Sequence, residues 1–413
     1  MGDPPRNPEV TPDTWTGCIP IVRIRASPAR TFPSLGMTDR SGPALDRRAF
    51  VLASLAAAGG AVASRLLPSL PLHAQASRPE LVIRNPRPLG AEAPLEALRE
   101  WRTPNDLFFV RSHFGPPATL PTRWTLTVDG EVERPITLDL AAIRRLPAVT
   151  VPVTLECAGN GRGLMALPST SGIQWQRGAV SNAEWTGTRL ANVLQRAGLR
   201  PSAAHFWMEA ADGAGPRVPK FLRSISREVA LRDALLVWEM NGEPIPLLHG
   251  GPLRLLVPGW YGMASTKWLT HIHARATESD NNFMAKGYRY PDGSPVERMR
   301  VKSLIATPSD GARIPVGPVR VAGVAWSGTG AIRQVDASID GGATWRPARL
   351  TGRADATAWR TWEADLPIGR SGRYGVRARA TDASGAVQPA VAATNPAGYS
   401  NNSIHEVRFD VVA

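Results

Sequence analysis

The alternation of apolar and polar residues predicts strands mixed with helices in the part of the chain before about residue 300. WTLTVDGEVERPITLDL (124–140) has the two-residue period of strands on both sides of residues 129–130, Asp-Gly, which predicts a β-hairpin. The overlapping TLDLAAIRRLP predicts a short helix that is ended by Pro147. VTVPVTLEC (149–157) follows and predicts a buried strand.

Further segments of the same region continue this mixture. One helix is expected near residues 94–101, and apolar residues at helical spacing predict another over 186–199, which stops at Gly198. Strands are expected within 205–210, 251–260 and 266–276. The region from 77 to 300 is therefore predicted to be an α+β domain.

The pattern changes near residue 300, after which short alternating runs recur with Gly, Pro and Asp turns between them. RQVDASIDGGATW (333–345) and GRYGVRARATDASG (372–385) are examples. This spacing predicts an all-β sandwich of immunoglobulin-like style over residues 301–413. Such a domain is usually a scaffold or an interface rather than a reaction site.

The first 76 residues have the features of an export signal. Arg47 and Arg48 precede an apolar run from Ala49 to Ser64, and residues 74–76, Ala-Gln-Ala, offer a cleavage site. The run has 16 residues, too few for a stable membrane span. We expect a twin-arginine signal that delivers the protein to the periplasm, with translation starting at Met37. The predicted parts are thus a leader and signal (1–76), an α+β domain (77–300) and a β-domain (301–413).

Composition narrows the function classes. The formal net charge is +13, from 44 Arg and 4 Lys against 35 acidic residues. A genome rich in GC would produce this excess of arginine, and so would an electropositive cleft for an anionic substrate. The arginines form no basic run or helical stripe, so nucleic acid is not an expected partner.

Cysteine use directs attention to a single residue. Cys18 and Cys157 are the two cysteines, so no disulfide framework is possible, and cleavage near Ala76 leaves Cys157 alone in an oxidising compartment. It lies between the predicted strand and a glycine-rich turn that includes Arg162. A thiolate there suits a soft metal centre, whereas a buried, inert cysteine is the alternative that composition leaves open.

TLECAGNGRG (154–163) resembles the molybdenum-binding signature of the sulfite oxidase family of molybdopterin enzymes. The resemblance continues in matching order through FFVRSH (108–113), VWEMNGEPIPLLHGGPLRLLVPGWYG (237–262) and FMAKGYRY (283–290). It implies a molybdenum–molybdopterin cofactor whose metal is bound by Cys157. It also implies that 77–300 is the molybdopterin-binding catalytic domain and that 301–413 is an immunoglobulin-like dimerisation domain.

The same resemblance assigns roles to further residues. Those expected in the substrate pocket are Arg111, Arg162, Trp175 and Tyr288. Those expected to bind the cofactor are Phe109, Arg111, His113, Asp212, His249, Arg254, Ser265, Thr266 and Lys267.

The implied activity is oxygen-atom transfer, with sulfite or a related sulfur compound oxidised to sulfate. The expected electron acceptor is a c-type cytochrome, and a homodimer through the C-terminal domain is also implied. One position departs from the family's pattern: the stretch N-x-R-G, whose arginine closes the sulfite pocket, is here NPAG with Ala397. Two alternatives stay open: a reductase of a sulfoxide or nitrate-like substrate, and a non-catalytic exported binding protein.

Overall fold

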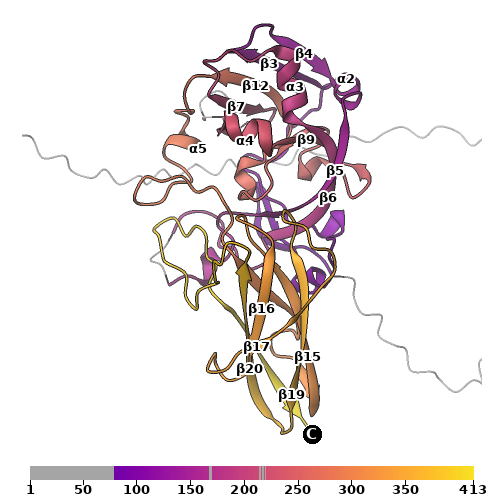
Figure 1. Ribbon diagram of the computed structural model, residues 1–413, viewed down its shortest axis with the longest axis vertical. Helices are drawn as coiled ribbons and strands as arrows, with labels where there is room; N and C mark the ends of the chain where they lie inside the picture. Colours follow the sequence, from indigo (N-terminus) through magenta and orange to yellow (C-terminus); the bar gives the residue numbers. More distant parts are fainter. Residues whose placement is uncertain (1–78, 167–169, 214, 216–217, 219) are drawn as a thin grey trace, which may run out of the picture. The chain divides into compact units, whose positions relative to one another are not determined.

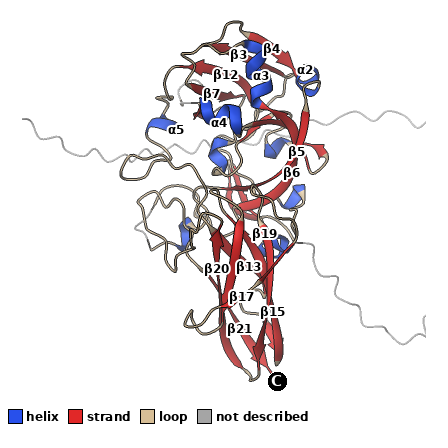
Figure 2. Ribbon diagram, in the orientation of Figure 1, coloured by secondary structure: helices blue, strands red, loops and turns tan. Residues whose placement is uncertain are grey.

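The computed structural model describes residues 79–166, 170–213, 215, 218 and 220–413. They belong to one compact unit, Ser77–Ala413. The predicted signal, its cleavage site and Met37 lie outside the described residues. Within this unit the helices all come from the part of the chain before residue 300, and strands alone follow it (Figures 1 and 2).

The α+β region contains two five-stranded sheets and a short N-terminal hairpin. The hairpin consists of β1 (Val82–Pro86) and β2 (Leu89–Glu92). One sheet has the order β10-β9-β6-β5, with β11 also paired to β9; its strands are β5 (Ala148–Glu156), β6 (Val180–Arg189), β9 (Leu235–Met240), β10 (Glu243–Pro244) and β11 (Arg254–Leu256). The other has the order β4-β3-β12-β7-β8; its strands are β3 (Thr125–Gly130), β4 (Ile136–Asp139), β7 (His205–Ala210), β8 (Leu222–Ser226) and β12 (Leu269–Arg275).

Helices in this region are short, and three of the four α-helices that the structure describes there begin at a capping side chain. The α-helices are α2 (Leu140–Arg144), α3 (Leu190–Ala197), α4 (Arg227–Arg232) and α5 (Asn282–Ala285). Single 3-10 turns cover Leu95–Arg99, Asn105–Leu107, Arg162–Leu164, Leu247–His249 and Gly262–Ala264. Asp139 and Ser226 cap α2 and α4, because each side chain accepts a backbone N–H of the first turn. The apolar face of α3, which includes Val193 and Leu194, packs into a core shared with β3 and β12.

The C-terminal region is built from two sheets that share one apolar core. Its strands are β13 (Lys302–Thr307), β14 (Arg313–Pro315), β15 (Gly317–Trp326), β16 (Ile332–Ser338), β17 (Arg346–Pro347), β18 (Arg349–Thr351), β19 (Arg360–Ile368), β20 (Gly372–Asp382) and β21 (His405–Val412). Their orders are β13-β15-β19-β18 and β14-β21-β20-β16-β17. Val321 and Trp362 of the first sheet are fully buried in the same cluster as Val376 and Phe409 of the second.

The structure confirms several predicted elements and corrects the bounds of two. The hairpin over 124–140 is present, but residues 129–130 still belong to β3 and the chain turns over 131–135. The short helix after it and the buried strand that ends at Glu156 are also present. The helix predicted over 186–199 is wrong in its first turn, because residues 186–189 still belong to β6 and the helix begins at Leu190. Gly187 explains the difference: a side chain there would meet the carbonyl oxygen of Leu236 at 2.1 Å, so the chain is held in close β-pairing.

In the described part of the chain, no helix is both long and apolar enough to cross a membrane.

Candidate active site

The predicted residues converge on one cavity of the α+β region. The space that no protein atom fills there, including open solvent at its mouth, is about 740 Å³. Most of the predicted site residues line it: Phe109, Arg111, His113, Cys157, Asp212, His249, Arg254, Ser265, Thr266, Lys267 and Tyr288. Arg162 and Trp175 are not among its lining residues.

Cys157 stands where β5 ends and the glycine-rich turn begins. Its N–H donates to the carbonyl of Ala179 at 2.9 Å, and its own carbonyl accepts the N–H of Asn160 at 2.9 Å. Gly161 has φ +89°, and a side chain there would lie 2.9 Å from the amide of Asn401. Burial raises the pKa of the Cys157 thiol, and the nearby charge of Arg111 opposes that shift. A bound cation would keep this sulfur in the thiolate form.

Arg111, His113 and Tyr288 form a continuous hydrogen-bonded row along the cavity. Arg111 Nη2 lies 3.2 Å from His113 Nδ1, and His113 Nε2 lies 2.8 Å from the hydroxyl of Tyr288. Burial, with the charges of Arg111 and Arg223, lowers the pKa of His113 to about 3, so the imidazole is neutral at neutral pH. Burial raises the pKa of Tyr288 to about 12, so its phenol keeps its proton.

Arg254 is a buried cation that lacks a carboxylate partner within the described residues. It is 3% exposed, and its two terminal nitrogens donate to the carbonyls of His249 and Ser265 at 2.7 and 3.0 Å. Its Nε and the hydroxyl of Thr266 are buried without a hydrogen-bond partner in the described structure. Burial lowers the pKa of Arg254 to about 9. Unsatisfied buried donors beside a cavity are the arrangement that an anion would complete.

Lys267, Asp212 and His249 surround the same part of the cavity. Lys267 Nζ donates to the carbonyl of Leu248 at 2.6 Å, and burial together with Arg254 holds its pKa well below the usual value. His249 Nε2 lies 2.8 Å from the carbonyl of Asn105, and burial with the charge of Lys267 lowers the pKa of His249 to about 3. Burial raises the pKa of Asp212 to about 6. These ionisable side chains therefore surround the cavity, and in the described structure they form no direct ion pairs with one another.

Arg162 and Trp175 occupy different surroundings from the rest. Arg162 Nε donates to the carbonyl of Ala397 at 2.9 Å and its Nη1 to the carbonyl of Ile173 at 3.2 Å. Its charge nevertheless acts on the Cys157 thiol and opposes the rise in its pKa. Trp175 is 1% exposed and packs in an apolar cluster against which Cys157 also packs. Both residues thus support the cysteine turn from outside the cavity.

Three residues near the site were missed by sequence reasoning. Arg223 is 2% exposed, and its guanidinium lies 5.2 Å from the centre of the Tyr288 ring. Glu156, directly before Cys157, forms a buried ion pair with Lys302 of β13. Glu156 could have been noticed from its place in the cysteine stretch. Arg223 and Lys302 carried no such signal, because their contacts join distant parts of the chain.

Comparison with known proteins agrees with this arrangement. Residues 113–283 match the oxidoreductase molybdopterin-binding domain, and residues 294–412 match the Mo-co oxidoreductase dimerisation domain. Sulfite oxidase of Gallus gallus is 36% identical over 337 residues, which cover 75% of this chain and 73% of that protein. The chain belongs to the sulfite oxidase family.

Two further proteins are similar to this chain. Mitochondrial sulfite oxidase of Mus musculus is 36% identical, with 81% of this chain matched to 66% of that longer protein. The crystal structure of the sulfane dehydrogenase SoxCD from Paracoccus pantotrophus is similar, with a TM-score of 0.72, 30% identity and coverage of 83% of this chain and 93% of that one. The protein is thus an oxidoreductase with a molybdenum–molybdopterin cofactor, and its C-terminal β-rich region is a dimerisation domain by family.

Proposed function

We propose that this enzyme oxidises sulfite, or a related small sulfur compound, to sulfate by oxygen-atom transfer. The observation that carries the proposal is the cavity itself, where the Cys157 sulfur and the cationic groups of Arg111, Arg254 and Lys267 line one space. Such a set suits an anionic cofactor and an anionic substrate together. The names of the sulfite oxidase relatives support the substrate class.

The cavity residues fit the expected cofactor. The partnerless Nε of Arg254 and hydroxyl of Thr266 are donors that a phosphate group would satisfy, with Lys267 adding charge. Within the described residues no three His, Cys, Asp or Glu side chains are grouped to hold a metal ion. Cys157 would hold the metal through its sulfur, since a thiolate suits a soft or sulfur-rich metal centre. When bound, this group supplies two-electron oxygen-atom transfer chemistry.

The protein's own contribution lies in the row of Arg111, His113 and Tyr288. Arg111 would attract and orient a sulfur oxyanion, since its charge lines the cavity that Cys157 also lines. Because Arg111 can only donate, neutral His113 accepts at Nδ1 and carries its proton on Nε2, which donates to the Tyr288 oxygen and leaves the phenol hydrogen free for another acceptor. Tyr288 would then donate a hydrogen bond to the reacting oxygen and carry a proton to or from it.

Ala397 bears on the choice of substrate. Its carbonyl binds Arg162, so this loop contributes a backbone acceptor to the support of the cysteine turn and no cation. A substrate pocket without the family's arginine at this position has less positive charge and therefore attracts sulfite less strongly. Alanine is also smaller than arginine, so it leaves more space for a larger sulfur compound.

Reduction of an oxygenated substrate is the second candidate. Nitrate reductase [NADH] 1 of Oryza sativa is 32% identical over 366 residues, which span 40% of that protein. The same residues would serve oxygen transfer in either direction, so the redox partner decides between them.

We further propose a periplasmic enzyme that passes electrons to a c-type cytochrome and forms a homodimer through an immunoglobulin-like C-terminal domain. The paired arginines before the apolar run at 49–64 support export. The family name of residues 294–412 supports the dimer.

A substrate screen tests the proposed function. Purified protein is analysed for molybdenum and then assayed against sulfite, thiosulfate, a sulfoxide and nitrate, with cytochrome c or an artificial electron carrier. One molybdenum per chain and turnover with sulfite or thiosulfate are expected. Absence of molybdenum, or turnover restricted to nitrate or sulfoxide, would refute the proposal.

A further inference from the structure

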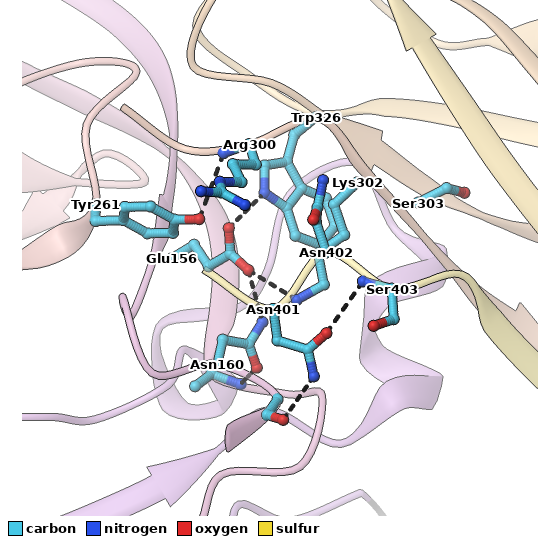
Figure 3. Close-up of polar contacts among 12 residues, drawn as sticks. Glu156, Asn160, Tyr261, Arg300, Lys302, Ser303, Trp326, Asn401, Asn402 and Ser403 are labelled. Carbon is cyan, nitrogen blue, oxygen red and sulfur yellow. Dashed lines mark hydrogen bonds and ion pairs between the residues drawn. The ribbon is translucent and has the colours of Figure 1, made fainter. Parts of the chain in front are cut away.

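A buried ion pair lies directly behind the cysteine turn. Glu156 is the last residue of β5 and precedes Cys157, whereas Lys302 is the first residue of β13. Lys302 Nζ lies 3.0 Å from Glu156 Oε1, and the two side chains are 3% and 2% exposed. Figure 3 marks the contact between the two side chains with a dashed line. The pair joins the two domains at the residue next to the proposed metal ligand.

The carboxylate of Glu156 accepts hydrogen bonds from two further donors. Asn160 Nδ2 donates to Oε1 at 3.0 Å, and the indole N–H of Trp326 donates to Oε2 at 2.9 Å (Figure 3). Asn160 Oδ1 accepts the N–H of Ala179, whose carbonyl accepts the N–H of Cys157. Hydrogen bonds therefore connect the carboxylate to the backbone that positions the sulfur.

Stability alone does not account for such a pair. Taking both charges out of water costs several kcal/mol per ion, and well-packed apolar residues are commonly as stabilising as a buried ion pair. Burial lowers the pKa of Lys302, and the charge of Glu156 opposes that shift. The position of the pair is more informative than its energy, since a charge in a dry interior acts on neighbouring groups much more strongly than one in water.

We infer that Glu156 and Lys302 are positioning residues that balance the charge beside Cys157 and thereby set the reduction potential of the metal it binds. The inference rests on the proposed function, because it requires a metal on Cys157. An uncompensated negative charge here favours the oxidised, more positive metal. An uncompensated positive charge favours the reduced metal. Trp326 and Lys302 place this balance under the control of the C-terminal domain.

Single substitutions that change charge in opposite senses test the inference. The molybdenum-loaded full-length protein and its Glu156→Gln and Lys302→Gln variants are titrated with redox mediators, and the midpoint potential is read from the molybdenum electron paramagnetic resonance signal. E156Q removes the negative charge and should raise the potential. K302Q removes the positive charge and should lower it. Asp336→Asn, which removes a carboxylate paired with Arg379 on β16 and β20 at 3.2 Å, is the matched control.

Two more variants keep the test decisive if a single charge change prevents folding. Trp326→Phe removes one donor to the carboxylate but keeps both charges, and it should lower the potential. The double variant E156Q/K302Q should lie between the two single variants. Shifts of E156Q and K302Q in the same direction, or no shift beyond that of D336N, would overturn the inference, as would an unchanged potential in W326F when the single variants do not fold. A wild-type protein without molybdenum would instead refute the proposed function.

Discussion

At the scale of single residues, Cys157 links the backbone of the site to its chemistry. Its place at the end of β5 fixes the backbone, and its sulfur faces the same cavity as Arg111 and Tyr288. A thiol whose pKa is raised by burial becomes a thiolate only with a cationic partner, so its reactivity depends on the metal.

Cys157→Ser replaces a soft sulfur with a hard, weakly acidic hydroxyl. We expect turnover to fall by at least about 100-fold, the upper range for loss of a group that supports a bound metal. The fold should persist, because serine has nearly the shape of cysteine. Steady-state assays, metal analysis and circular dichroism measure the three quantities. Activity equal to that of the wild type would show that the sulfur is not the ligand.

Asp212 gives a prediction for stability against pH. Its folded pKa of about 6 is above the value near 4 of an unfolded chain, so its contribution is fully present below pH 4 and is lost as pH rises through 6. His113 and His249, with pKa values of about 3, act in the opposite sense: their contribution is lost as pH falls below 6.5.

Comparison of Asp212→Asn with the wild type isolates the carboxyl group. In metal-free protein, D212N should be more stable than the wild type by about 1–3 kcal/mol at pH 7, with the advantage vanishing near pH 4. Urea unfolding at several pH values measures the difference. A difference that does not vary with pH would contradict the burial of a charged Asp212.

The cysteine turn shows how one element is specified at the scale of secondary structure. Residues 157–161 leave the strand, reverse direction and bring Gly161 against Asn401, whose amide donates to the Gly161 carbonyl at 2.8 Å. Backbone with positive φ disfavours any side chain, and here the space is also filled.

Gly161→Ala should therefore destabilise the protein by more than the backbone strain alone. The left-handed backbone costs roughly 1–2 kcal/mol with a side chain present, and the contact with Asn401 adds displacement of the turn. Gly242→Ala is the matched control, because its φ is +82° and a side chain there would meet nothing within 4 Å. G161A should lose molybdenum and activity, whereas G242A should lose only a little stability. Equal molybdenum content in both variants would argue against the role of the turn.

Much of the secondary structure around the site could be predicted from the sequence. The two-residue periodicity located β5 and hence the cysteine at its end, because one face of a strand must be buried. The continuation of β6 through residues 186–189 was missed because it depends on close pairing of Gly187 with Leu236, which is distant in sequence. Helical spacing alone therefore extended α3 by a turn too many.

At the scale of the whole molecule, the contacts that the sequence could not predict are those between residues far apart in the chain. The resemblance of motifs grouped eleven expected residues correctly around one cavity, since each motif carries its own position in the family's fold. The pairing of Glu156 with Lys302 joins residues 146 positions apart, and no local pattern specifies such a contact. Arg162 and Trp175 lie outside the cavity lining because the rest of the fold decides which way a loop side chain points.

Net charge belongs to the whole chain, and it gives a prediction for kinetics. The whole chain has a net charge of +13 and stays strongly positive after loss of the predicted leader and signal, which hold eight Arg and five acidic residues. With cationic groups around its cavity, the protein should therefore attract an anionic substrate over distances beyond contact. With sulfite, kcat/KM should fall by about tenfold or more as ionic strength rises, because salt screens charges over about 8–10 Å. The value of kcat at saturation should change little. Stopped-flow assays in increasing salt measure both, and a salt-independent kcat/KM would indicate that steering is absent.

Contacts from the C-terminal domain to the cysteine turn also constrain the order of synthesis. The turn depends on Lys302, on the carbonyl of Ala397 and on the amide of Asn401, all made late on the ribosome. A nascent chain that ends before these residues holds the metal ligand without its supports. The cysteine turn therefore has all of these supports only when nearly the whole chain has been released, and we expect cofactor loading to follow translation rather than accompany it.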